Sequence, residues 1–182
     1  MKTVLLNSVL CTFLSSLAWA QVDRAARVLD DQLKSEEREV VGLVEAMPAN
    51  KFDFAPTAGA FKDVRTFAMQ AKHIAYIIDE VSSGLLQEKN PSTTGKNENG
   101  PDEVATKDDV VKYISQAFAY AHKAFATLSA QNIFEEVQNP FGGTRKMLRL
   151  EVANIALWHT YDHYGQMVIY ARMNNIVPPA SR

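Results

Sequence analysis

Four long stretches of helical periodicity dominate this sequence of 182 residues and limit the folds that it can adopt. Apolar residues recur at intervals of three and four over residues 23–47, 61–86, 106–128 and 145–174. No stretch shows the apolar–polar alternation of a half-buried strand. Helices with one apolar face bury it against one another, so the sequence predicts an all-α four-helix bundle. On the first helix, the solvent face is assigned to Arg27, Asp30, Lys34, Glu36 and Glu37.

The predicted helices are joined by connections of unequal length. Pro48 ends the first helix, and residues 51–60 form a loop. Gln87–Ala105 is strongly polar and longer than most helix–helix connections. Fully extended, such a segment spans on the order of 60 Å, enough to return along a helix and start the next one in parallel. We interpret it as a crossover, with a lid over a functional site as the alternative. A further loop is predicted over residues 130–144.

The first 20 residues have the features of a secretory signal peptide. Lys2 supplies a positive charge, residues 4–17 are mostly apolar, and Ala18-Trp19-Ala20 forms a cleavage motif of small residues. The apolar run is too short and too interrupted by polar residues for a membrane-spanning helix. We therefore expect cleavage after Ala20, a mature domain over residues 21–182, and a periplasmic or secreted location.

The composition excludes several classes of function. Cys11 is the only cysteine and lies in the predicted signal peptide, so the mature chain has no thiol nucleophile, thiolate ligand or disulfide. The net charge is −2 and no basic stripe is present, which argues against a nucleic-acid partner. No apolar run in the mature sequence is long enough to anchor it in a membrane.

Two histidines in the last predicted helix, His159 and His163, indicate a metal site. A spacing of four residues corresponds to an offset of about 40°, so both imidazoles project from one helix face. A buried pair must satisfy four ring nitrogens without water, and one shared metal ion at about 2 Å does so. Two core histidines, each hydrogen-bonded to another helix, are the alternative. Gln166 lies on the same face, and we expect it to support the metal ligands.

His73 is the candidate for a third ligand. It lies near the middle of the second predicted helix, and the histidine pair lies near the middle of the fourth. If these helices are neighbours, three imidazoles converge at one depth. Three protein ligands that leave one coordination position for water or substrate are typical of catalytic zinc sites. His122, on the third predicted helix beside Phe118 and Phe125, is assigned a structural role.

The same residues carry a resemblance to a known family. Three segments resemble DinB-like proteins: Lys72-His73-Ile74-Ala75, the His159/His163 pair followed by Gly165-Gln166, and Phe54-Ala55-Pro56. The resemblance covers nearly the whole mature chain. It implies a bundle with an up-down-down-up order, in which the long crossover joins helices 2 and 3. It also implies a divalent metal ion held by His73, His159 and His163.

The resemblance implies a choice of activities. Some relatives are transferases that join a small thiol to an electrophile at the metal. Small thiols are scarce or oxidised outside the cytoplasm, so the predicted export favours a metal-dependent hydrolase that activates water and acts on an unknown small molecule. The candidate bases are Asp162, Tyr161 and Tyr164. The alternative is a non-catalytic metal-binding or stress-associated structural bundle, or a homodimer of such bundles, in which the metal is mainly structural. Imidazole ligands suit zinc or nickel, with iron and copper as further alternatives.

Overall fold

The computed structural model describes residues 26–91 and 97–182, so the predicted signal peptide lies outside the described residues. Most of the described chain is helical: a first helix over residues 26–46, α2 (Phe67–Leu86), α3 (Lys107–Phe125) and α4 (Arg149–Met173). Short elements occupy the connections: the 3-10 turns η1 (Ala49–Lys51) and η2 (Pro179–Ser181), and the strands β1 (Glu136–Val137) and β2 (Met147–Leu148). The predicted four-helix bundle is confirmed.

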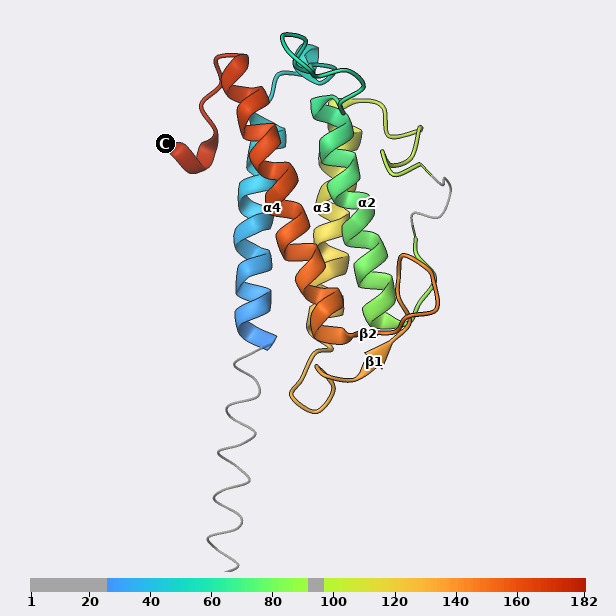
Figure 1. The fold of residues 1–182 in the computed structure, drawn as a ribbon. Coiled ribbons are helices and arrows are strands. Elements are labelled where there is room, and N and C mark those ends of the chain that lie inside the picture. Colours follow the sequence, from blue (N-terminus) through green and yellow to red (C-terminus); the bar gives the residue numbers. More distant parts are fainter. Residues whose placement is uncertain (1–25, 92–96) are drawn as a thin grey trace, which may run out of the picture.

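The helices run up, down, down and up in Figure 1. α2 and α3 are parallel, so α2 ends at one end of the bundle and α3 begins at the other, as predicted for a crossover connection. α2 packs against both α3 and α4. The first helix is joined to α3 by Lys107, whose Nζ donates to the backbone oxygens of Glu45 (2.6 Å) and Met47 (2.9 Å). None of the described helices combines the length and apolarity that a membrane span requires.

α2 begins later in the chain than the predicted start at Phe61. Thr66 caps the helix with its side chain. The Phe67 N–H donates to the backbone oxygen of Phe54 (2.9 Å), so the preceding loop satisfies part of the first turn. Asp63 has φ of 62°, which a right-handed helix does not allow. These local contacts outweigh the apolar spacing that favoured an earlier start.

The small antiparallel pair of β1 and β2 was not predicted. β1 lies within the loop predicted over residues 130–144, and β2 directly precedes α4. As a result, α4 begins at Arg149 and not at Arg145. The N–H of Leu148 donates to a carboxylate oxygen of Glu151 (2.8 Å), which closes the first turn of α4. Strands of two residues are too short to show alternation in a sequence.

An acidic side chain of the first helix, that of Glu36, lies fully buried in the bundle. Glu36 is 0% exposed, so its assignment to the solvent face of the first helix was wrong. Neither of its carboxylate oxygens has a hydrogen-bond partner within the described residues. Burial, followed by the charge of Glu39, raises the pKa of Glu36 to about 9. The carboxyl group is therefore neutral at physiological pH.

Candidate metal centre

Three histidines from α2 and α4 come together in the upper half of the bundle. The Nε2 atom of His159 lies 3.2 Å from the Nε2 of His73 and 3.2 Å from the Nε2 of His163. The donor atoms of all three residues lie within 4.8 Å of one another. Imidazoles bound to zinc at about 2.0–2.1 Å in a tetrahedron hold their nitrogens about 3.3 Å apart. The cluster therefore has the spacing of a metal site.

Hydrogen bonds on the far side of two rings direct their lone pairs into the cluster. Nδ1 of His73 donates to the backbone oxygen of Glu98 (2.5 Å), and Nδ1 of His163 donates to Oε1 of Gln70 (2.6 Å). A ring that carries its proton on Nδ1 presents a lone pair on Nε2. Nε2 of His159 could donate to only one of these two lone pairs. A cation satisfies all three nitrogens, as in metal sites with hydrogen-bonded imidazoles.

The cluster holds its imidazoles in the neutral form that a metal needs. Burial, followed by the neighbouring imidazoles, lowers the pKa of His159 to about 3 and that of His163 to about 4. Burial also lowers the pKa of His73, and the positive charge of Arg65 contributes for all three rings. Nδ1 of His159 is buried and has no hydrogen-bond partner among the described residues. All three rings are therefore neutral at physiological pH.

Gln70 supports the cluster and was missed from the sequence. Its side chain is only 2% exposed, and its Nε2 donates to Oε1 of Gln166 (2.9 Å). Gln166 is exposed, contrary to the inward position predicted, and it reaches His163 only through Gln70. The spacing between Gln70 and His73 could have indicated this role, because residues three apart lie on the same face of a helix.

The three candidate bases differ in their relation to the cluster. Asp162 is exposed and accepts a hydrogen bond from Nε2 of Gln166 (3.3 Å). Its negative charge raises the pKa of His163, but burial, which lowers that pKa, has the larger effect. Tyr161 and Tyr164 pack against each other with ring centroids 6.3 Å apart. Burial raises the pKa of both tyrosines, and the negative charge of Glu39 on the first helix raises them as well. Asp162 is thus the candidate base whose carboxylate interacts with the cluster.

The crossover between α2 and α3 contributes to the site. Besides accepting from His73, Glu98 pairs with Arg65 (Nη2 to Oε2, 3.3 Å), and Asn99 accepts from Nε of Arg65 (2.7 Å). Gly100 follows with φ of 78°, and a Cβ there would lie 3.0 Å from Cβ of Lys72. Only glycine allows this close approach without displacing the segment. The crossover therefore helps to position His73.

His122 lies outside the cluster, on α3. Its Nδ1 is 2.6 Å from Oδ1 of Asp30 and its Nε2 is 3.2 Å from Oε2 of Glu37. Both partners belong to the first helix. His122 therefore joins two helices, which is the kind of structural role predicted for it.

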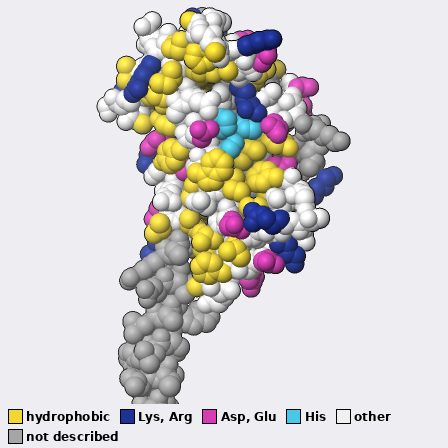
Figure 2. All heavy atoms as spheres, in the orientation of Figure 1, with side chains coloured by type: hydrophobic (Ala, Val, Ile, Leu, Met, Phe, Trp, Pro, Cys, Tyr) yellow, Lys and Arg dark blue, Asp and Glu magenta, His cyan; other side chains and the backbone are white. Residues whose placement is uncertain are grey.

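The histidine cluster reaches the molecular surface. Figure 2 shows imidazole at the surface where α2 and α4 meet, with acidic side chains on both sides, a basic side chain above and hydrophobic side chains below. Part of the cluster is therefore exposed to solvent, although His73 and His163 are only 5% and 8% exposed.

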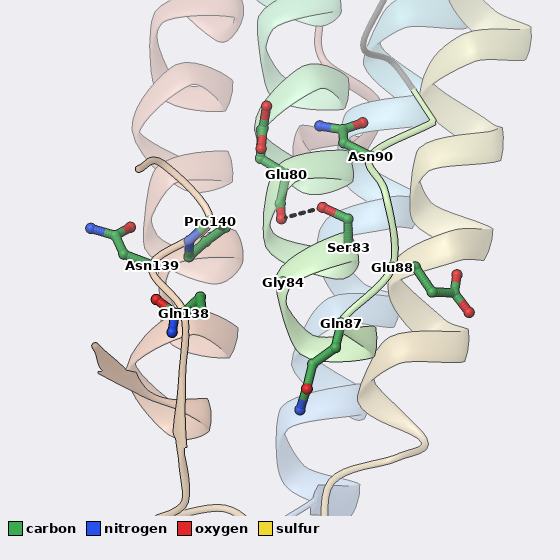
Figure 3. A pocket seen from close by; sticks show the side chains of 9 residues that line it. All are labelled: Glu80, Ser83, Gly84, Gln87, Glu88, Asn90, Gln138, Asn139 and Pro140. Carbon is green, nitrogen blue, oxygen red and sulfur yellow. Dashed lines mark hydrogen bonds between the residues drawn. The ribbon is translucent and has the colours of Figure 1, made fainter. Parts of the chain in front are cut away.

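A separate cavity of about 380 Å³ lies near the other end of α2 (Figure 3). It is bounded by the last turns of α2, where the hydroxyl of Ser83 donates to the backbone oxygen of Glu80 (2.9 Å), and by the loop after β1. A Cβ on Gly84 would lie 2.9 Å from Cβ of Pro140, so glycine permits the close contact of loop and helix. This cavity contains none of the candidate site residues.

Fold and site together define an up-down-down-up helical bundle with a three-imidazole cluster that can hold a metal ion. The family model of the DinB superfamily matches residues 32–167, and the chain belongs to this superfamily. A DinB-like protein from Bacillus cereus ATCC 10987 has a similar structure, with a TM-score of 0.63, 16% identity, and coverage of 81% of this chain and 93% of that one. A DinB-like protein from Bacillus subtilis, YjoA, also has a similar structure, with a TM-score of 0.61 and 14% identity. The match covers 81% of this chain and 91% of that one. No curated protein matches the chain.

Proposed function

We propose that this protein binds one divalent metal ion through Nε2 of His73, His159 and His163 and hydrolyses a small molecule at that site. The observation that carries the proposal is the convergence of three Nε2 atoms, with 3.2 Å between neighbours, on a cluster open to solvent. A divalent ion in such a site polarises a substrate oxygen and lowers the pKa of bound water towards neutrality. Zinc and nickel are the preferred candidates, followed by iron and copper, because imidazole suits all four metals.

The residues around the cluster supply the remaining functions of a hydrolase. The carboxylate of Asp162 accepts a proton at the solvent-facing side of the site, and Gln166 holds that carboxylate in place. Gln70 and the backbone of Glu98 fix the tautomers of His163 and His73. Tyr161 and Tyr164, with their raised pKa values, remain protonated at neutral pH and are weaker candidates for the base.

The site of action is outside the cytoplasm. The charged, apolar and small-residue order of residues 1–20 supports export with cleavage after Ala20. An exported enzyme meets few reduced small thiols, which makes hydrolysis the preferred reaction over thiol transfer.

The alternative is a non-catalytic metal-binding bundle that forms a homodimer. The outer face of α4 carries three large apolar side chains that are at least half exposed, Trp158 (54%), Ile169 (51%) and Met173 (51%). A second copy that covered this face would bury them and restrict access to the cluster. Light scattering of the metal-loaded protein gives its oligomeric state. A dimer that shows no turnover in the assay described next supports the alternative.

The test of catalysis is hydrolysis of a panel of small esters, lactones and amides by protein titrated with zinc or nickel. Turnover should rise until one metal ion per chain is bound. Asp162→Asn should abolish turnover while metal content is unchanged, and Asp53→Asn, a change at another exposed aspartate, should have no effect. Turnover that requires an added thiol and an electrophile would assign the protein to the transferases. No turnover with any substrate would favour the non-catalytic alternative.

A further inference from the structure

From the residues around the cluster we infer that the ligand of this site is a small organic anion with an aromatic or apolar body. The anionic group would lie between the metal position and Arg65, and the body would lie against Trp158. The inference rests on the proposed metal site, because it places the ligand between two groups that flank the three imidazoles. It adds a chemical class of ligand to a site whose substrate the family leaves open.

Arg65 is placed and oriented to receive an anion. Its Nε donates to Asn99 (2.7 Å) and its Nη2 to Glu98 (3.3 Å), so the guanidinium is held in one orientation. Its Nη1 makes no hydrogen bond within residues 26–91 and 97–182. The side chain is 30% exposed, and its charge acts on all three imidazoles of the cluster. A planar guanidinium beside a metal position matches the two oxygens of a carboxylate.

Trp158 provides an apolar surface beside His159. Its ring meets the ring of His159 edge to face, with centroids 5.7 Å apart, and 54% of the residue is exposed. Trp158 directly precedes His159 on α4, so an exposed indole lies next to one of the three imidazoles. Figure 2 shows hydrophobic side chains below the imidazole.

The charges around the site favour an anion over an amine. A divalent ion and Arg65 together outweigh the two acidic side chains at the edge, Asp162 and Glu98. The carboxylate of Glu98 already accepts from Nη2 of Arg65, so it competes with an incoming carboxylate for the guanidinium. Removal of the Glu98 charge should therefore strengthen anion binding, and the backbone oxygen that accepts from His73 would be unchanged.

The experiment measures binding of three probes to the zinc-loaded full chain by calorimetry: phenylacetate, acetate and benzylamine. Phenylacetate should bind about 10-fold or more tightly than either of the others, since it alone uses both Arg65 and Trp158. Arg65→Gln should weaken phenylacetate binding by about 10- to 100-fold, and Glu98→Gln should strengthen it. Trp158→Ala should remove the preference for phenylacetate over acetate.

Metal content of every variant, determined in the same samples, separates this inference from the proposed function. Arg145→Gln, which changes an exposed arginine paired with Glu151, is the matched control and should bind phenylacetate like the wild type. If one zinc is bound but phenylacetate shows no advantage, or if Arg65→Gln behaves like Arg145→Gln, the inference is wrong and the metal site stands. If no zinc is bound, both the inference and the proposed function are wrong.

Discussion

Replacement of Gln70 by leucine should weaken metal binding although Gln70 is not a ligand. Its Oε1 accepts the only hydrogen bond that Nδ1 of His163 makes among the described residues, at 2.6 Å and with 2% of the glutamine exposed. Leucine has a similar size but no acceptor, so the proton of His163 is no longer held on Nδ1. Loss of such a supporting group typically costs 10- to 100-fold in metal affinity, or about 1.4–2.7 kcal/mol. An unsatisfied buried donor should also lower the free energy of unfolding by about 1–3 kcal/mol.

The affinity is measured by competition of each variant against a zinc chelator. Gln70→Glu should retain or increase the affinity, because a carboxylate accepts the same hydrogen bond and makes the imidazole more basic. Gln116→Leu, at an exposed position on α3, is the matched control and should leave the affinity unchanged. If Gln70→Leu binds zinc within about twofold of the wild type, the His163 tautomer is not set by Gln70 and the reasoning is refuted.

Three further predictions concern pH, the core and the N-terminus. For the metal-free protein, the imidazole pKa values of about 3 for His159 and about 4 for His163 lie below the unfolded value of 6.5, so the stability that the neutral cluster provides is present above pH 6.5 and is lost as pH falls towards 4. Urea unfolding across this range should show a smaller loss in His159→Ala than in the wild type, because the variant keeps the lowered pKa values of His73 and His163. The pKa of Glu36 is raised from 4.5 to about 9, so its contribution is lost as pH rises through that range. Glu36→Met should remove this loss and raise the free energy of unfolding at neutral pH by about 1–3 kcal/mol, whereas an unchanged urea profile would contradict it. Mass spectrometry of the native protein should find an N-terminus at Gln21, and a chain that keeps Met1 would exclude cleavage.

The sequence was sufficient to predict the bundle, because four helices with long apolar stripes can form few other folds. It was also sufficient to predict that His159 and His163 lie on one helix face, because the geometry of a helix fixes the offset between residues four apart. The later start of α2 depends on the backbone oxygens of Phe54 and Phe52, which accept from the N–H groups of Phe67 and Ala68, and no periodicity reveals these hydrogen bonds. Glu36 was misplaced because its charge was given more weight than its position, three residues after Leu33 and four before Val40, both fully buried. The support of His73 by Glu98 could not be predicted, because a backbone oxygen in a loop leaves no signal in the side chains.

The central claim is that His73, His159 and His163 together hold one metal ion, and the most direct measurement is metal per chain in wild type and four single variants. Elemental analysis after dialysis should give one divalent ion per chain in the wild type and in His122→Ala, whose histidine pairs with Asp30 and Glu37 outside the cluster. His73→Ala, His159→Ala and His163→Ala should each lose stoichiometric metal, because each removes one of three ligands. The variants should still fold and lose only the stabilisation by bound metal, about 3–4 kcal/mol at 100 to 1,000 times the dissociation constant. Metal retained in His73→Ala and lost in His122→Ala would contradict the assignment of the site.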